Sequence, residues 1–269
     1  MKRAAAALGA LIVGVALLAA LFGPAFVTDP FSQDILQRLH PPVWLGGDRL
    51  HPLGTDGLGR DYLARLVYGA RISLLIGVTA ALTSGVIGVT LGVVGGFFGG
   101  WVDDVVMFII TCRLSLPFVL VALAIVSAVG SSLTIVVLTL GLLLWDRFAV
   151  VARITTMQIR NLDYIAAAHA AGASTWHILT REIFPNIMPY LAVVVALEIA
   201  LAILLEAVLS FLGLGVPAPL PSWGLMIAEG KDYMFFKPWI IMVPGAALFT
   251  LVLGINLLGD GLLDLFRRG

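Results

Sequence analysis

Two acidic side chains lie inside a long apolar run and are the first candidates for chemistry. Glu198 and Glu206 fall within the stretch from Ile187 to Leu212. If this run crosses a membrane, an ionisable group in it costs about 2.5–3.5 kcal/mol and marks a candidate functional site. A spacing of eight residues is just over two helical turns, so both acids lie near one face. Three interpretations stay open: the acids line a pathway, form buried hydrogen bonds that fix helix packing, or lie near the outer boundary of the span.

The sequence offers no recognisable enzymatic machinery. It has no Gly-x-x-x-x-Gly-Lys-Ser/Thr loop to hold a nucleotide, because its Gly230-Lys231 pair is followed by Asp232. It has no Gly-x-Ser-x-Gly turn for a serine nucleophile. The histidines do not have the spacing of a metal site; they are His40, His51, His169 and His177. We therefore expect a protein that is not an enzyme and that binds no cofactor or metal itself.

The composition is that of a membrane protein. The 269 residues are 60% hydrophobic and 12% charged, with a mean hydropathy of +1.05, whereas a soluble domain is about a quarter charged. The formal net charge of zero argues against a nucleic-acid partner. Apolar stretches long enough to cross a bilayer predict an all-α membrane protein with six transmembrane helices. These stretches are Ala4–Val27, Ile72–Phe98, Val105–Val129, Leu133–Ala152, Ile187–Leu212 and Trp239–Leu258.

Six spans place both termini on one side of the membrane. Basic residues near the two ends, Lys2, Arg3, Arg267 and Arg268, favour the cytoplasm for that side. We place Arg113 and Arg147 at cytoplasmic span ends as well, although the basic residues of the first outer loop make the bias small. The span count and the long segment before Ile187 therefore carry more of this prediction than the charges do.

We expect a single transmembrane domain over residues 1–269. Residues 1–28 form its first span, 29–70 an extracytoplasmic loop, 71–262 a core of five spans, and 160–185 a cytoplasmic loop. The half of the outer loop from Gly54 to Arg71 has the pattern of a capped amphipathic helix, with Tyr62 and Tyr68 as interface anchors.

The second span carries glycines at intervals of four residues: Gly88, Gly92 and Gly96. Small residues at this spacing let two helices approach closely. Packing within the chain is the favoured interpretation, and an interface with a partner subunit is the alternative.

The cytoplasmic segment from Tyr164 to Pro189 predicts two short helices joined at a turn, which we call the elbow. Asn161 or Asp163 can cap the first helix, and Gly172 interrupts it. Ser174 can cap the second, in which apolar residues at spacings of three and four form one stripe: Trp176, Leu179 and Ile183. Pro185 is expected to begin the next element.

The elbow resembles the cytoplasmic coupling loop of ABC-importer permeases, in which a Glu-Ala-Ala stretch precedes a glycine and a proline-containing ending. The matching residues are Ala167, Ala168, Gly172, Ala173, Pro185, Asn186 and Pro189. Ala166 stands where that family has its acid, and Glu182 where a histidine is common. The resemblance implies that the loop contacts ATPase subunits, and the candidate contact residues add Trp176, Leu179 and Arg181.

Four further stretches resemble the dipeptide, oligopeptide and nickel branch of these permeases. They are Gly54–Arg71, the run from Glu206 to Gly215, Pro221–Gly224 and Asn256–Gly261. The resemblance implies a type I ABC importer permease fold in the inner or plasma membrane of a prokaryote, with both termini cytoplasmic. It also implies a second homologous permease, two ABC ATPase subunits that bind ATP and Mg, and an extracytoplasmic substrate-binding protein.

The expected function is that of a permease subunit which carries di- or oligopeptides along a path shared with the second permease. One alternative is the same architecture importing nickel or another small solute. An alternative of a different class is a secondary transporter driven by an ion gradient, which would favour inverted repeats around a midplane charge. No such repeat is evident, and that alternative would leave the elbow unexplained.

Overall fold

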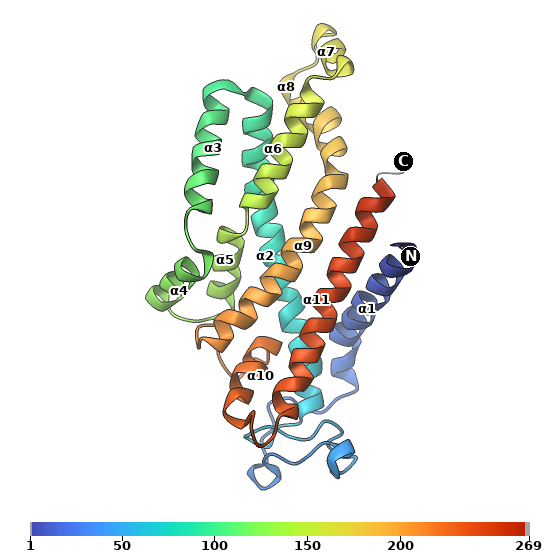
Figure 1. The fold of residues 1–269 in the computed structure, drawn as a ribbon, viewed down its shortest axis with the longest axis vertical. Helices are drawn as coiled ribbons and strands as arrows, with labels where there is room; N and C mark the ends of the chain where they lie inside the picture. The colour runs from blue at the N-terminus through green and yellow to red at the C-terminus, as the bar shows by residue number, and fades with distance from the viewer. Residues whose placement is uncertain (1, 267–269) are drawn as a thin grey trace.

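The structure is a computed structural model that describes residues 2–266, with side-chain surroundings described for 4–262. Its long helices run roughly along one axis (Figure 1). The first half of the chain forms α1 (Lys2–Phe22), α2 (Tyr62–Phe98), α3 (Gly100–Leu114), α4 (Phe118–Val129) and α5 (Leu133–Leu143). The second half forms α6 (Asp146–Arg160), α7 (Asp163–Ala170), α8 (Thr175–His177), α9 (Phe184–Phe211), α10 (Trp223–Gly230) and α11 (Trp239–Phe266).

The predicted span count is reached in an unexpected way. Within the described residues, five helices are long and apolar enough to cross a membrane, and a sixth crossing requires that the bent pair α3–α4 count as one span. The two helices of this pair are bent by 81°, so the apolar stretch Val105–Val129 is not one continuous helix. Pro117 lies at the bend, where it lacks an N–H donor and disfavours helical geometry in the preceding residue.

The glycines of α2 face α6. A Cβ on Gly88 would lie 2.6 Å from Phe148 Cβ, and one on Gly92 would lie 2.8 Å from Ala152 Cβ. A Cβ on Gly96 would lie 2.6 Å from the Arg153 carbonyl oxygen. Only glycine allows the two backbones to approach this closely. The structure therefore places all three glycines in a contact within the chain.

The remaining core joins the other spans around α2 and α9. One apolar cluster connects α1, α2, α9 and α11 through residues such as Ile203, Leu251 and Ile255. A second joins α2, α4, α5 and α9 around Ile76 and Leu140. Figure 1 shows α1 and α11 side by side at one edge of the bundle.

The outer loop differs from its prediction in its second half. Residues 54–61 form turns and an isolated bridge between Thr55 and Asp61, and no separate amphipathic helix covers Gly54–Arg71. Asp61 instead caps α2 by accepting from Ala64 N, and α2 continues from Tyr62 into the span without a break. Tyr62 is 1% exposed and packs edge-on against Trp239, so it does not anchor an interfacial helix. The remainder of the loop contains the short 3-10 turns Ile35–Gln37 and Val43–Leu45, and a third such turn, Gly23–Ala25, directly follows α1.

Both ends of the described chain point toward the elbow. In Figure 1 the elbow helix α7 lies at one extreme of the molecule, and the first residues of α1 and the last of α11 point to the same side. The outer loop and α10 lie at the opposite extreme. The terminal charges used above lie outside the residues with described side chains: Lys2, Arg3, Arg267 and Arg268.

Candidate functional site

The elbow turns at Gly172, as the sequence predicts. Gly172 has φ +83°, in the left-handed region that favours glycine. Its N–H donates to the His169 carbonyl at 3.0 Å, and the N–H of Ala173 donates to the Ala168 carbonyl at 3.0 Å. These two bonds form a Schellman motif at the end of α7. Ser174 then accepts from the N–H of His177 and caps α8, which confirms its predicted role.

The start of α7 differs from the prediction. Leu162 occupies the N-cap position and makes no side-chain cap, while Asp163 is the first helical residue. Asp163 there places a negative charge beside the positive end of the helix dipole. The Asn161 side chain donates back to the Met157 carbonyl instead.

The buried stripe of the elbow agrees with the prediction at Ile183 and in part at Leu179, but not at Trp176. Trp176 is 75% exposed. Ile165, Ile178 and Ile183 are fully buried, and they pack against residues of α6 and against Ile187 of α9. Leu179 and Ala173 are half-buried beside this cluster. The candidate contact residues that remain exposed are Ala167, Gly172, Trp176, Arg181 and Pro185, and Ala168 is half-buried.

A π-helical turn over Ile178–Ile183 explains the difference. The five-residue step from Ile178 to Ile183 is one π turn, so both side chains fall on the same face, whereas a 3.6-residue repeat would separate them. This turn joins α8 to α9, and the candidate span runs unbroken from Thr175 to Phe211. Pro185 therefore lies in the first turn of α9 but inside a longer continuous helix, rather than beginning a separate element.

A polar contact ties the two arms of the elbow together. Asn186 Nδ2 donates to the Tyr164 hydroxyl at 3.4 Å and to the Glu182 carbonyl at 2.5 Å. Partial burial, and secondly the carboxylate of Glu182, raise the pKa of the Tyr164 phenol, so the hydroxyl stays neutral in this contact. The elbow is thus held in shape by contacts on its inner side and exposes its outer side.

Glu206 connects the end of α9 to the start of α10, at the end of the bundle opposite the elbow. Its Oε1 accepts from Ser210 Oγ at 2.7 Å and from Ser222 Oγ at 2.8 Å, and its side chain is fully buried. Ser222 also caps α10 by accepting from Leu225 N at 3.0 Å. Gly224 packs on the other side, where a Cβ would lie 2.7 Å from Glu206 Oε2. Of the three sequence interpretations, this geometry fits a buried hydrogen bond that fixes packing.

Glu198 lies in a different environment. It is 1% exposed, and its Oε1 lies 3.5 Å from Arg147 Nη1 at the start of α6, while Oε2 is buried without a hydrogen-bond partner among the described residues. Arg113 reaches the same region from the end of α3, bonding to the Leu143 carbonyl and lying 3.9 Å from Asp146. The two acids of α9 therefore contact different elements: Glu206 bonds to Ser210 and Ser222 near α10, and Glu198 pairs with Arg147 of α6.

The placement of Arg113 and Arg147 at span ends was wrong. Arg147 lies near the middle of the candidate span Leu133–Arg160, where α5 ends and α6 begins. Arg113 lies beside the bend between α3 and α4. An interruption of the apolar run by Trp145-Asp146-Arg147 was visible in the sequence, but hydropathy alone gives no depth to such an interruption.

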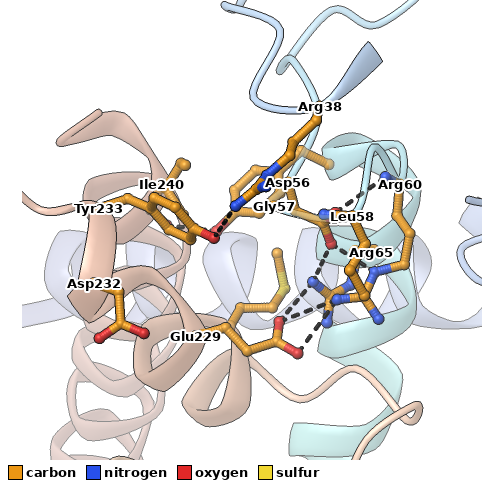
Figure 2. Close-up of a pocket in the computed structure, with 12 residues that line it drawn as sticks. Arg38, Asp56, Gly57, Leu58, Arg60, Arg65, Glu229, Asp232, Tyr233 and Ile240 are labelled. Carbon is orange, nitrogen blue, oxygen red and sulfur yellow. Dashed lines mark hydrogen bonds and ion pairs between the residues drawn. The ribbon is translucent and has the colours of Figure 1, made fainter. Parts of the chain in front are cut away.

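A second charged cluster lies among the outer loop, α2 and α10. Arg65 is 1% exposed and its Nη1 donates to Asp56 at 2.5 Å and to Glu229 at 2.7 Å. Arg60 bonds to the same Asp56 at 2.6 Å. Figure 2 shows these side chains converging at one wall of a pocket of about 320 Å³, whose other wall carries Tyr233. These ion pairs fix the outer loop onto α2 and α10. Glu229 could not be predicted as a partner, because it is 164 residues from Arg65 in the sequence.

The architecture is that of an ABC importer permease. A solved inward-facing structure of the MetNI methionine ABC transporter matches with a TM-score of 0.61 at 18% identity, covering 76% of this chain and 95% of the other. A crystal structure of an amino acid ABC transporter with histidines gives 0.54 at 18% identity, covering 77% and 94%. At this identity the likeness establishes the fold, an all-α membrane protein of the ABC importer permease type.

Comparison of sequences gives the family. Residues 88–269 match the model of the binding-protein-dependent transport system inner membrane component. A di/tripeptide transport system permease of Pseudomonas aeruginosa is 40% identical over 95% of this chain and 85% of its own length. A glutathione transport system permease of Pectobacterium atrosepticum is 36% identical over 94% and 82%, and a dipeptide transport system permease of Haemophilus influenzae 34% over 96% and 88%.

The chain therefore belongs to the family of binding-protein-dependent transport system inner membrane components. It is a multi-pass inner-membrane permease subunit of an ABC importer and is not itself catalytic. ATPase and substrate-binding proteins are general partners of such a subunit. This assignment replaces the alternative of a secondary transporter driven by an ion gradient.

Proposed function

We propose that this permease imports short peptides, along a path that it forms with a second homologous permease. The support is that relatives named for di/tripeptides, dipeptides and glutathione align over at least 94% of this chain at 34–40% identity. Import of nickel or another small solute by the same architecture is the second candidate, because the branch of permeases that this sequence resembles includes both peptide and nickel importers.

The elbow is the surface on which an ATPase subunit would act. Its exposed outer side presents Trp176, Arg181 and the Gly172 turn, while its inner side is locked to the bundle by buried isoleucines. Its two arms continue directly into α6 and α9, so a displacement of the elbow moves two spans at once. This connection of the elbow to two spans is the observation that supports its coupling role. Two ATPase subunits, one for each permease, would bind and hydrolyse ATP with Mg.

The proposed orientation places the elbow and both termini in the cytoplasm. The elbow then meets the ATPases, and the outer loop with α10 faces the extracytoplasmic binding protein that delivers the substrate. The support is the arrangement in Figure 1, where the elbow and the ends of α1 and α11 point to one side and the outer loop to the other.

Substitution of Gly172 tests the coupling role. Gly172→Val forces a β-branched residue into φ +83°, which costs roughly 1–2 kcal/mol for a residue with a Cβ and reshapes the turn. The importer, reconstituted with its ATPases and binding protein, should then hydrolyse ATP with little peptide uptake. Gly46→Val is the matched control, since Gly46 has φ +89° in the outer loop and, like Gly172, has open space around it.

The outcomes separate coupling from substrate. Equal uptake per ATP in both variants would contradict the role of the elbow. Uptake of labelled Ni²⁺ but not of a labelled dipeptide by the unmodified importer would move the substrate assignment to the second candidate and leave the coupling role standing.

A further inference from the structure

Charged residues from three helical segments meet near the middle of their spans. Arg113 lies at the bend between α3 and α4, Asp146 and Arg147 at the break between α5 and α6, and Glu198 near the middle of α9. The ion pairs Arg113–Asp146 at 3.9 Å and Arg147–Glu198 at 3.5 Å place the four in one group. Two positive and two negative charges leave this midspan cluster formally neutral.

Arg147 differs from the rest of the cluster in its exposure. Its side chain is 56% exposed, against 1% for Glu198, 14% for Asp146 and 13% for Arg113. A guanidinium at midspan depth is too costly to face lipid and therefore faces a protein partner or a water-filled path. The surface that carries Arg147 thus belongs to the inside of the assembled importer.

The surroundings of Arg147 are those of a small binding site. A hollow of about 240 Å³ opens beside it, lined by Asp146 and otherwise by aliphatic side chains such as Val150, Val194 and Leu197. Apolar walls with a few fixed polar groups are typical of ligand sites. The planar fork of arginine matches a carboxylate in two-point contact, and Glu198 occupies only one side of it.

We propose that Arg147 binds the terminal carboxylate of the peptide during its passage, and that Glu198 is a positioning residue that holds the guanidinium toward the path. The inference rests on the proposed peptide substrate. A peptide with free ends and uncharged side chains is neutral overall, so its entry leaves the charge balance of the midspan cluster unchanged. The aliphatic hollow beside Arg147 would take the adjacent side chain.

The competing explanation is structural: Arg147 serves only to neutralise Glu198. Removing one member of a buried pair strands the other, whereas removing both charges does not. The double variant Arg147→Gln/Glu198→Gln therefore separates the two explanations. Arg147→Lys adds a variant that keeps the pair but lacks the two-point geometry.

The experiment measures initial uptake by the complete importer in proteoliposomes at saturating, peptide-loaded binding protein. The substrates are one labelled dipeptide and its C-terminal amide. We expect the unmodified importer to favour the free acid by about tenfold, in line with the loss of one charge-assisted hydrogen bond. The double variant should bring this ratio to about one, and Arg147→Lys should give an intermediate ratio. Arg71→Gln, which removes another exposed arginine of a spanning helix, should leave the ratio unchanged.

Two results would overturn the proposal. One is an unmodified importer that takes up acid and amide equally. The other is a double variant that keeps the preference for the free acid, which would assign Arg147 the structural role alone. Both differ from a failure of the proposed function, in which the unmodified importer takes up neither peptide although its ATPases are active.

Discussion

The contact between α2 and α6 allows a sharp test, because two glycines of α2 face the same residue at different distances. A Cβ on Gly88 would lie 2.6 Å from Phe148 Cβ and 2.9 Å from Ala149 N. A Cβ on Gly85 would lie 3.5 Å from the Phe148 ring, an ordinary contact distance. Gly88→Ala must therefore push α6 away, whereas Gly85→Ala needs no movement.

The size of the effect follows from these distances. The atom nearest to a Cβ on Gly88 is the Trp145 carbonyl oxygen at 2.2 Å, so the backbones must separate by about 1.2 Å to reach a contact of 3.4 Å. Overpacking of this kind typically costs about 1–3 kcal/mol. The gain in helix propensity on replacing glycine by alanine is about 1 kcal/mol and is common to both variants, so it cancels. Gly88→Ala should be less stable than Gly85→Ala by about 1–3 kcal/mol.

The assay is thermal unfolding of the purified permease in one detergent, with both variants and the unmodified protein measured side by side. We expect Gly85→Ala to unfold at or above the temperature of the unmodified protein and Gly88→Ala clearly below it. Equal unfolding temperatures for the two variants would refute the close contact of α2 with α6.

Two buried polar groups give further predictions. Glu206→Ala leaves the hydroxyls of Ser210 and Ser222 without their buried acceptor, which should cost about 1–3 kcal/mol, while Glu206→Gln keeps an acceptor and should lose less; equal losses in thermal unfolding would contradict the hydrogen-bonding role. Arg65→Gln removes one of the two guanidinium groups that pair with the buried carboxylate of Asp56 and leaves Arg60 in place, so it should cost about 1.5–3 kcal/mol. Thermal unfolding that shows no loss for Arg65→Gln would argue against the ion pair.

The local signals in the sequence predicted the elbow well. Gly172 and Ser174 each act through the backbone of their neighbours, as a left-handed turn and as a cap, so their roles follow from residue type alone. The π turn could not be predicted in this way. A search for apolar residues at spacings of three and four selects Trp176, Leu179 and Ile183, whereas the helix adds one residue, buries Ile178 together with Ile183 and leaves Trp176 exposed.

The spans show a second limit. Hydropathy located the apolar part of α2 from Ile72 but excluded Tyr62 to Arg71, because it counts Arg65 as a surface charge. In the fold this arginine is buried and paired with Asp56, nine residues before it, and with Glu229, which is remote in sequence. The same reasoning failed for Arg147, whose partner Glu198 comes from another span. Half of the candidate site at midspan could thus be predicted from the sequence. Glu198 was identified as a candidate residue, whereas Arg147 was placed at the end of its span.

The π turn before α9 also sets the direction, around the axis of α9, in which the elbow points. One residue more or less in a helix rotates everything beyond it by about 100° around the helix axis. Deleting a single residue between Ile178 and Ile183 would therefore swing Trp176 to another side of α9 and leave the sequence of the turn at Gly172 intact. The direction in which this permease presents Trp176 is set by the residue count of the helix that enters the membrane, so two permeases with the same turn sequence but different counts would present it in different directions.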